Sequence, residues 1–431
     1  MIKIAFMGAG SIEFTRSIVT DLCGYPELAG SLHLALYDID PERLHFAEAL
    51  ASKISGQARS GALVTASTDR REALEGARYV INEIQVGGYA ATRADFDIPA
   101  RYGVRQTIGD TLGIGGIFRG LRTIPVVVGM ARDMLDVCPD AYLLNYTNPM
   151  AMLPWAAYEG AGLERVYGLC HSVRDTHALL AGLVGLDPSD VDFLTAGFNH
   201  QAFVLKFENK GQSLYPRLAE VIDAAPELER RVRVEIFRRF GFFPTESSEH
   251  SAEYVPWFMR HDEQIERFRI FVGDYLDRSE RNLRELETLQ HQLDDGARLE
   301  ASAGDELASQ FIHSLETGMQ REIYVNVRNG GLITSLPEQS CVEVPCRVGA
   351  AGPEPVAVGA LPPQLAALNR TFLNVVELTV RAALDGCRDH VYQAALLDPN
   401  TAATLTTAQT VAMCDELLDA HAGLLPPELT K

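Results

Sequence analysis

Short apolar runs alternate with stretches of helical spacing through the first half of the chain. After the apolar run Ile2–Met7, Phe14, Ile18 and Leu22 recur on one helix face, and Gly24 is a natural helix end. This alternation predicts a parallel, doubly wound sheet. The predicted strands are Ile2–Met7, Leu32–Tyr37, Ala62–Ala66, Tyr79–Ile84, Ala141–Tyr146, Val166–Cys170 and Leu194–Asn199, and the predicted helices include residues 14–24, 40–51, 68–77 and 117–135.

The pattern changes in two places. Residues 85–116 form a Gly-rich stretch that is too long for a plain connection, and we expect a functional loop there. Past about residue 200, the chain predicts a strand at 202–207, charged helices near 226–240 and 260–300, a mixed segment at 324–330 and helices from 363 to 421. Because 431 residues exceed one compact core, we predict a first lobe of residues 1–195 and an α+β lobe of residues 196–431.

The composition argues against two classes of binding partner. The 38 basic and 58 acidic residues give a net charge of −20, which repels phosphate backbones and anionic lipid. We therefore expect neither nucleic acid nor a membrane as a partner, and we find no apolar run of about 18 residues. The seven cysteines show no regular framework and no signal peptide opens the chain, so we expect a cytoplasmic protein with reduced thiols.

The turn after the first predicted strand favours a dinucleotide. Gly8 and Gly10 lie between a strand and a helix, where bare backbone and the helix N-terminus can approach a pyrophosphate. Asp38 ends the second strand and could accept hydrogen bonds from a ribose, which favours NAD over NADP. The alternative is a tight turn without a ligand, since Glu13 replaces the third glycine of the usual fingerprint.

Reactive side chains follow several apolar strands. In a doubly wound sheet, ligands bind beyond the carboxyl ends of the strands. A thiolate at Cys170 and an imidazole at His200 could hold a divalent ion with open positions for substrate oxygens. Each residue also has a structural alternative, as a small core cysteine or a hydrogen-bonded histidine. The stretches concerned are Gly109–Gly116, Asn145–Pro149, Cys170–Val173 and Phe198–His200.

The chain resembles glycoside hydrolase family 4 along essentially its whole length. The motifs that carry the resemblance occur in the same order as in the family. They are Gly8–Ser11, Gln85–Tyr89, Gly109–Gly113, Asn148–Met152, Gly168–Val173, Gly197–His200, Thr245–His250, Glu253–Phe258, Asn326–Asn329 and Cys341–Cys346. The Cys-His-Ser-Val sequence at 170–173 is similar to that of the α-galactosidase (melibiase) branch. The resemblance implies a Rossmann-like doubly wound parallel sheet of the lactate/malate dehydrogenase type, with a second α+β lobe.

The resemblance also implies an unusual route of hydrolysis, because NAD-dependent members of this family are an exception among glycosidases. The sugar is oxidised at C3, deprotonated at C2 and cleaved at C1 by elimination, and water then adds. The substrate would be a terminal α-D-galactoside, and the cofactors NAD and Mn²⁺, with Co²⁺, Ni²⁺ or Zn²⁺ also possible. A homodimer or homotetramer is the family's expected assembly.

Residue roles follow from the matched motifs. The resemblance implies Tyr254 as the C2 base and Asp110 as the acid at C1. The implied contacts are Cys170 and His200 to the metal; Gly8, Gly10, Ser11, Asp38, Gly87 and Asn148 to the cofactor; and Asn148, His171 and Asn199 to the substrate. Ile114 stands where close melibiases usually have proline, which predicts a looser loop around Asp110.

Other functions remain open at this point. An α-glucosidase, an α-galacturonidase or an α-glucuronidase of the same family is the nearest alternative. A more remote one is an NAD-dependent dehydrogenase of hydroxy acids or sugars, which would consume NAD in proportion to product. A sugar- or nucleotide-sensing module without catalysis would not need the implied acid, base and metal ligands.

Overall fold

A nine-stranded mixed sheet runs through the molecule. The computed structural model describes residues 1–295, 304 and 306–431. The sheet order is β12-β11-β10-β6-β5-β4-β1-β2-β3, and a second sheet has the order β7-β8-β9. The strands are β1 Ile2–Met7, β2 Leu32–Tyr37, β3 Leu63–Ser67, β4 Tyr79–Asn82, β5 Tyr142–Asn145, β6 Val166–Gly168, β7 Asp192–Ala196, β8 Phe203–Asn209, β9 Gln212–Ser213, β10 Arg321–Arg328, β11 Cys341–Gly349 and β12 Gly352–Pro355.

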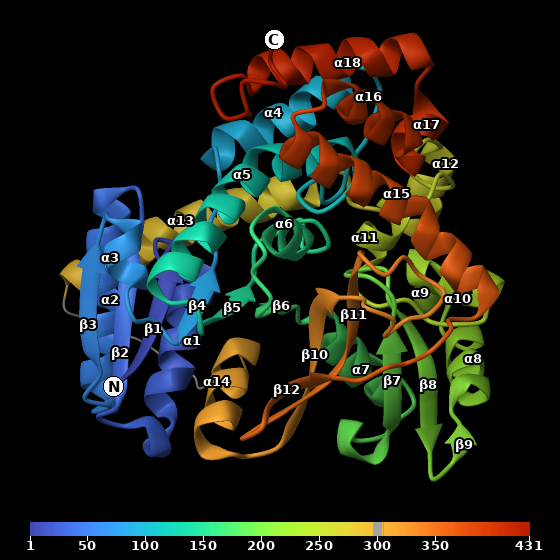
Figure 1. The fold of residues 1–431 in the computed structure, drawn as a ribbon. Coiled ribbons are helices and arrows are strands. Elements are labelled where there is room, and N and C mark those ends of the chain that lie inside the picture. Colours follow the sequence, from blue (N-terminus) through green and yellow to red (C-terminus); the bar gives the residue numbers. More distant parts are fainter. Residues whose placement is uncertain (296–303, 305) are drawn as a thin grey trace.

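The six strands β1 to β6 pair in parallel, which confirms the predicted doubly wound sheet. Their order is that of a dinucleotide-binding fold. The prediction for Leu194–Asn199 is wrong: β7 does not join the parallel series but pairs antiparallel with β8. Figure 1 shows this smaller sheet beside β11, to which the turn after β7 is joined by a bridge between Gly197 and Glu343.

The later part of the chain also extends the first sheet. Strand β10 pairs antiparallel with β6, and β11 and β12 follow it. Strands from both sides of the predicted lobe boundary at 195/196 therefore share each sheet, and the boundary itself stays a prediction. One row of paired residues crosses the main sheet near the carboxyl ends of its parallel strands. The row is Tyr37, Met7, Asn82, Asn145, Gly168, Asn326 and Glu343.

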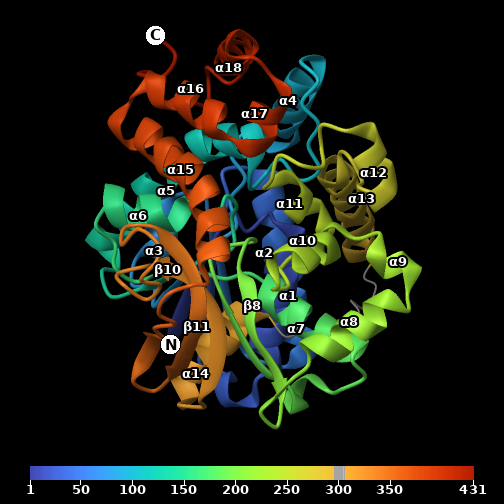
Figure 2. The ribbon, with the colours of Figure 1, turned by 90° about the vertical axis from the view of Figure 1, so that its right-hand side faces the viewer.

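Helices cover the sheets. They are α1 Ile12–Gly24, α2 Pro41–Ala58, α3 Arg70–Leu74, α4 Gly88–Arg101, α5 Gly113–Val137, α6 Leu153–Gly160, α7 Ser172–Leu183, α8 Tyr215–Asp223, α9 Pro226–Glu229, α10 Val232–Phe240, α11 Ser248–Glu253, α12 Asp262–Phe268, α13 Asp274–Asp294, α14 Leu307–Thr317, α15 Pro363–Asp385, α16 Arg388–Leu397, α17 Pro399–Thr404 and α18 Thr407–Ala420, with short 3₁₀ turns at Pro26–Leu28 and Pro188–Asp190. Figures 1 and 2 show α15 to α18 at the end of the molecule where α4 and α5 lie.

Several helix predictions can be compared with the structure. Asp40 caps α2 as expected, because its side chain accepts from the backbone N–H groups of Glu42 and Arg43 and Pro41 follows it. The helices predicted from 363 to 421 are confirmed. The loop predicted at 85–116 is wrong over about half of its length, since α4 occupies residues 88–101 and α5 begins at Gly113. The end of the helix predicted near 260–300 lies outside the described residues.

Helix α5 is the central helix of the covering layer. It is long and apolar enough to span a membrane by length and composition alone, but 83% of its apolar window is buried within the protein. That burial is typical of the core helix of a folded domain. Its buried residues include two arginines, and Arg122 is paired with Asp95 of α4.

We predict that the Arg122–Asp95 pair stabilises the fold strongly. Its Nη2–Oδ2 distance is 2.6 Å, both side chains are at most 2% exposed, and Arg122 Nε also donates to the Val86 carbonyl. Arg122→Met leaves the carboxylate of Asp95 buried without this partner, so the free energy of unfolding should fall by about 3–5 kcal/mol. Urea denaturation followed by circular dichroism measures the change.

The control for this change is a surface ion pair on the same helix α4. Arg93 and Asp97 are paired at 3.0 Å but are about half exposed. Arg93→Met should therefore cost less than about 1 kcal/mol. Equal losses in the two variants would contradict the predicted importance of the buried pair.

Candidate active site

The turn between β1 and α1 requires glycine. Gly8 has φ +84°, and a Cβ there would lie 2.9 Å from the Cα of Ile84. A Cβ on Gly10 would lie 2.8 Å from Asp38 Oδ2. The N–H of Ser11 closes the turn by donating to the Gly8 carbonyl at 2.9 Å. The turn leads directly into the N-terminus of the 13-residue helix α1, which is the position of a pyrophosphate site in dinucleotide-binding folds.

Asp38 also shapes this turn. The Gly10 N–H donates to its Oδ2, and the Asp40 N–H donates to its Oδ1, both at 2.9 Å. The side chain thus lies beside the glycine turn, as the sequence predicts for a ribose acceptor. Each carboxylate oxygen keeps a second lone pair for such a contact. The predicted role of Asp38 is consistent with this position but stays a prediction.

Gly87 directly precedes helix α4. It is the N-cap of α4 with φ +85°, and a Cβ there would lie 2.6 Å from side-chain atoms of Ala91 and Leu424. Backbone conformation and close packing against the C-terminal segment therefore explain the glycine. Its predicted cofactor contact stays a prediction.

Cys170, His200 and Glu246 form a group that could hold a metal ion. Cys170 Sγ lies 3.1 Å from His200 Nε2, which lies 3.7 Å from Glu246 Oε2, and the three ligand atoms are all within 4.8 Å of one another. Cys170 follows β6, His200 lies in the turn after β7, and Glu246 precedes α11. The structure thus brings together the two predicted ligands and adds a third that the prediction missed.

The electrostatics of the group call for a cation. Burial, and then the carboxylates of Glu246 and Glu343, raise the pKa of the Cys170 thiol. A thiolate is therefore unfavourable here unless a positive charge is bound, and a metal cation supplies one. His200 presents Nε2 to the group, and its buried Nδ1 has no hydrogen-bond partner among the described residues. The donor set of thiolate, imidazole and carboxylate fits a divalent transition metal.

Asp110 lies on the loop between α4 and α5 and is 5% exposed. Asn148 Nδ2 donates to its Oδ2 at 3.3 Å, and the Thr111 hydroxyl donates to its Oδ1 at 2.9 Å. Arg119 Nη1 lies 4.0 Å from Oδ2, and Arg119 Nε donates to the Asn148 carbonyl. Ile114 is fully buried in the first turn of α5. The predicted acid and the predicted cofactor and substrate contact Asn148 are therefore neighbours.

Tyr254 ends α11 and is 2% exposed. Its hydroxyl donates to the carbonyl of Asn199 at 3.3 Å, and its ring packs edge-on against Phe198 and Phe372. Burial raises the pKa of Tyr254 well above its ordinary value, and the carboxylates of Glu246 and Asp110 add to the effect. A nearby divalent cation would act in the opposite direction, which is the condition for a tyrosine base.

Glu253 joins the acid loop to the base. Its fully buried Oε2 accepts from the N–H groups of Thr107 and Ile108 at 3.0 Å and from the Thr107 hydroxyl at 2.7 Å. Thr107 begins the segment that leads to Asp110, and Glu253 directly precedes Tyr254. One carboxylate therefore fixes the two candidate catalytic segments against each other.

The two remaining predicted substrate contacts have different surroundings. Asn199 is buried, its Nδ2 donates to Glu343 Oε1 at 3.3 Å, and its Oδ1 has no partner among the described residues. The Oδ1 of Asn148 is buried and unpartnered in the same way. His171 is a quarter exposed, and its Nε2 lies 3.0 Å from Glu306 Oε2. The two amide oxygens could therefore still accept a hydrogen bond from a ligand, whereas His171 already has one partner.

The sequence analysis did not identify four charged residues of the site, which are Glu246, Glu253, Glu343 and Arg119. Three of them fall within motifs that carry the family resemblance, so the motifs marked their segments but not their roles. Glu343 is fully buried on β11 and accepts from Asn326 and Asn199. Arg119 reads in the sequence as an ordinary residue of an amphipathic helix.

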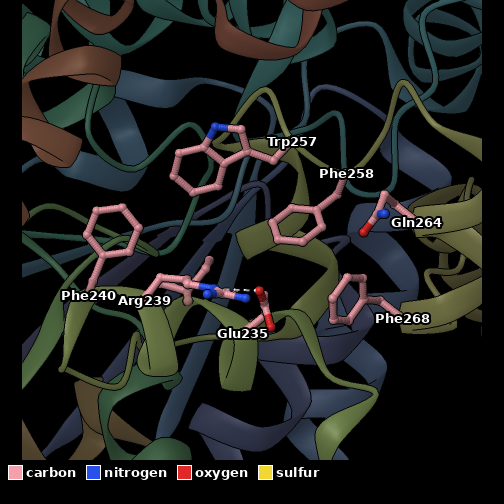
Figure 3. A pocket seen from close by; sticks show the side chains of 8 residues that line it. Glu235, Arg239, Phe240, Trp257, Phe258, Gln264 and Phe268 are labelled. Atoms are coloured by element: carbon pink, nitrogen blue, oxygen red, sulfur yellow. Dashed lines mark hydrogen bonds and ion pairs between the residues drawn. The ribbon is translucent and has the colours of Figure 1, made fainter.

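A separate pocket is lined in part by Trp257 and Phe258 of the Glu253–Phe258 motif (Figure 3). Trp257 is 43% exposed and stacks on Phe240, with ring centroids 5.7 Å apart. Phe258 and Phe268 form its other aromatic wall. The lining residues include none of the metal group and neither the candidate acid nor the candidate base. The chemistry of the site is therefore not located in this pocket.

Comparison with known proteins places the chain in a family. The model described as "Family 4 glycosyl hydrolase" matches residues 3–186, and the model of the family's C-terminal domain matches residues 195–401. The chain belongs to glycosyl hydrolase family 4. This family 4 hydrolase is 40% identical to an alpha-galactosidase of Bacillus subtilis (strain 168), over 99% of both chains. It is 36% identical to an alpha-galactosidase of Rhizobium meliloti (strain 1021), over 98% of this chain and 89% of that one.

Solved structures agree with the fold. A Bacillus subtilis protein, LplD, assigned as a glucosidase, is 27% identical with a TM-score of 0.88, over 97% of this chain and 100% of that one. A 6-phospho-alpha-glucosidase from gut microorganisms, in complex with NAD and Mn²⁺, is 20% identical with a TM-score of 0.81, over 98% of both chains. The second comparison carries the fold alone.

We predict that Glu253 makes stability depend on pH. Burial raises the pKa of Glu253 from 4.5 to about 7. Its protonated form is thus favoured in the folded state, and the stability it contributes is fully present below pH 4.5 and is lost as the pH rises to about 7. Glu253→Gln should remove this loss, which is on the order of 3 kcal/mol, because each pKa unit corresponds to about 1.4 kcal/mol.

Urea denaturation between pH 5 and pH 8 would measure this difference. The expected result is that the unfolding free energy of the wild type falls relative to that of Glu253→Gln across this range. Glu249→Gln makes the same chemical change on the same helix and is the control. A constant difference between wild type and Glu253→Gln at every pH would contradict the prediction.

Proposed function

We propose that this family 4 hydrolase cleaves terminal α-D-galactosides with NAD and a divalent metal, of which Mn²⁺ is the first choice. The observation that carries the proposal is the convergence of Cys170, His200, Asp110 and Tyr254, from four separate segments, on one buried region. The galactoside specificity is supported by the two alpha-galactosidases, which are 36% and 40% identical over nearly the whole chain.

The residues present fit both cofactors. The Gly8–Ser11 turn with Asp38 beside it would hold NAD, and Cys170 and His200 would hold the metal. When bound, NAD would accept and return a hydride at C3 of the sugar, and the metal would stabilise negative charge at O2 and O3. A related fold that holds NAD and Mn²⁺ together supports this pairing.

The chain's own residues move the protons. Tyr254 would remove the C2 proton, because it is buried and interacts electrostatically with Cys170 and Glu246 of the metal group. Asp110 would donate a proton to the oxygen that leaves from C1 and later help water to add. The unpartnered amide oxygens of Asn148 and Asn199 would accept hydrogen bonds from sugar hydroxyls. Because hydride is returned, NAD is not consumed.

We further propose that the enzyme works in the cytoplasm as a homodimer or homotetramer on a small-molecule substrate. The cysteines Cys23, Cys138, Cys170, Cys341, Cys346, Cys387 and Cys414 are all free thiols, which is typical of a reducing compartment. Gel filtration with light scattering would measure the assembly.

The first test is hydrolysis of 4-nitrophenyl α-galactoside and α-glucoside with NAD, Mn²⁺ and reductant, omitting each in turn. We expect galactoside hydrolysis that requires NAD and metal and produces no net NADH. Net NADH in proportion to product would indicate a dehydrogenase instead. Preferential hydrolysis of the glucoside would correct the sugar.

Asp110→Asn should distinguish leaving groups. 4-Nitrophenolate departs without a proton, whereas the sugar alcohol released from melibiose needs one, so loss of the acid should matter mainly for melibiose. We expect kcat/KM to fall by about 10²–10⁴ for melibiose and by much less for 4-nitrophenyl α-galactoside. Tyr254→Phe is the control, since loss of the base should slow both substrates alike. Equal losses for both substrates in Asp110→Asn would contradict its role as the acid.

A further inference from the structure

We propose that Glu246 is a third protein ligand of the metal, in addition to Cys170 and His200. The inference rests on the proposed function only in taking the Cys170–His200 pair as the metal site. It assigns a catalytic-metal ligand to a side chain that sequence reasoning did not single out.

Distances support a shared ion. Metal–ligand bonds to sulfur, nitrogen and oxygen are about 2.0–2.3 Å long, so the ligand atoms of one ion lie roughly 3–4.5 Å apart. The Sγ of Cys170 and the Nε2 of His200 are 3.1 Å apart, and Glu246 Oε2 is 3.7 Å from that same Nε2. The Sγ of Cys170 and a carboxylate oxygen of Glu246 are within 4.8 Å of each other. An ion between the three atoms would meet all of them after small shifts.

The carboxylate of Glu246 lacks another strong partner. Its distance from His200 Nε2 exceeds a hydrogen bond, and its Oε1 lies 3.4 Å from His250 Nδ1. That nitrogen already lies 2.9 Å from the Ser247 hydroxyl. Within the described part of the chain, no hydrogen-bond donor to the Glu246 carboxylate occurs, although its side chain is only 20% exposed. The guanidinium groups of Arg233 and Arg278 interact electrostatically with this carboxylate. A cation bound directly to its oxygens would compensate the charge at closer range.

The backbone conformation at Glu246 directs its side chain toward the other two candidate ligands. Glu246 has φ +67° and His200 has φ +64°, a conformation that is uncommon for residues other than glycine. The flanking residues hold the turn, because the Thr245 N–H donates to the Ala202 carbonyl and the Ser247 hydroxyl accepts from the His250 N–H. Both sides of the metal group are therefore held in unusual turns that present their side chains to each other.

A carboxylate also changes which metal the site prefers. A thiolate and an imidazole alone favour softer ions such as Zn²⁺ or Co²⁺, whereas carboxylate oxygen suits Mn²⁺. One thiolate and one carboxylate balance the charge of a divalent cation, with a neutral imidazole as the third ligand. Three protein ligands would still leave coordination positions of the metal open to a substrate.

The test is Mn²⁺ binding by the apoenzyme of Glu246→Gln, followed by the electron paramagnetic resonance signal of free Mn²⁺. We expect binding at least tenfold weaker than in the wild type and a smaller loss for Zn²⁺, so that the Mn²⁺-to-Zn²⁺ affinity ratio falls. Glu249→Gln removes a carboxylate three residues away and should bind Mn²⁺ within twofold of the wild type. NAD binding and circular dichroism check that the variants are folded.

Glu246→Asp is the second variant, and it keeps the charge if the glutamine variant fails to fold. Its shorter side chain should weaken Mn²⁺ binding less than glutamine does. In the Co²⁺-loaded enzyme, the thiolate charge-transfer band should persist in both variants, because Cys170 remains, while the ligand-field bands shift. Unchanged Mn²⁺ affinity and an unchanged Co²⁺ spectrum in both variants would overturn the inference.

Failure of this inference and failure of the proposed function give different results. If the wild type hydrolyses α-galactosides with Mn²⁺ and Glu246→Gln binds Mn²⁺ normally, Glu246 is no ligand and the function stands. If the wild type binds Mn²⁺ through Glu246 but cleaves no α-galactoside, the ligand assignment stands and the substrate is wrong.

Discussion

The structure depends on one row of backbone pairing across the main sheet. Parallel strands end at the same edge, so residues that follow paired positions are brought together. Gly8, Asp38 and Cys170 each follow this row by one or two residues, and Gly197 is bridged to its end at Glu343. The cofactor turn and the metal group are therefore parts of one edge, spaced by the fixed distance between strands.

This constraint explains which parts of the site the sequence could reveal. Cys170 follows an apolar strand, so its place at the sheet edge could be predicted from pattern alone. The proximity of Cys170 to His200 could not be predicted in this way. His200 follows β7, and β7 pairs antiparallel with β8 in the smaller sheet. Apolar alternation identifies a strand but not its partner. The catalytic roles of Tyr254 and Asp110 required the family resemblance, and they stay predictions.

Other features could not have been predicted for physical reasons. Helix α4 was not predicted, because the glycines before and after it made residues 85–116 resemble a loop. Glu246 comes from a turn between two helices, where no periodicity points to a partner. Glu343 and Asn326 meet the site only because β10 and β11 extend the parallel sheet from the other half of the chain. Such contacts arise from tertiary pairing, which local sequence does not encode.

The hydrogen bonds of Glu253 have a consequence for how this enzyme can diverge. The backbone of Thr107 and Ile108 is tied to the residue before Tyr254, so the segments of the candidate acid Asp110 and the candidate base Tyr254 are fixed to each other. A change in the length of the loop before α5 would therefore displace the Asp110 segment relative to the Tyr254 segment.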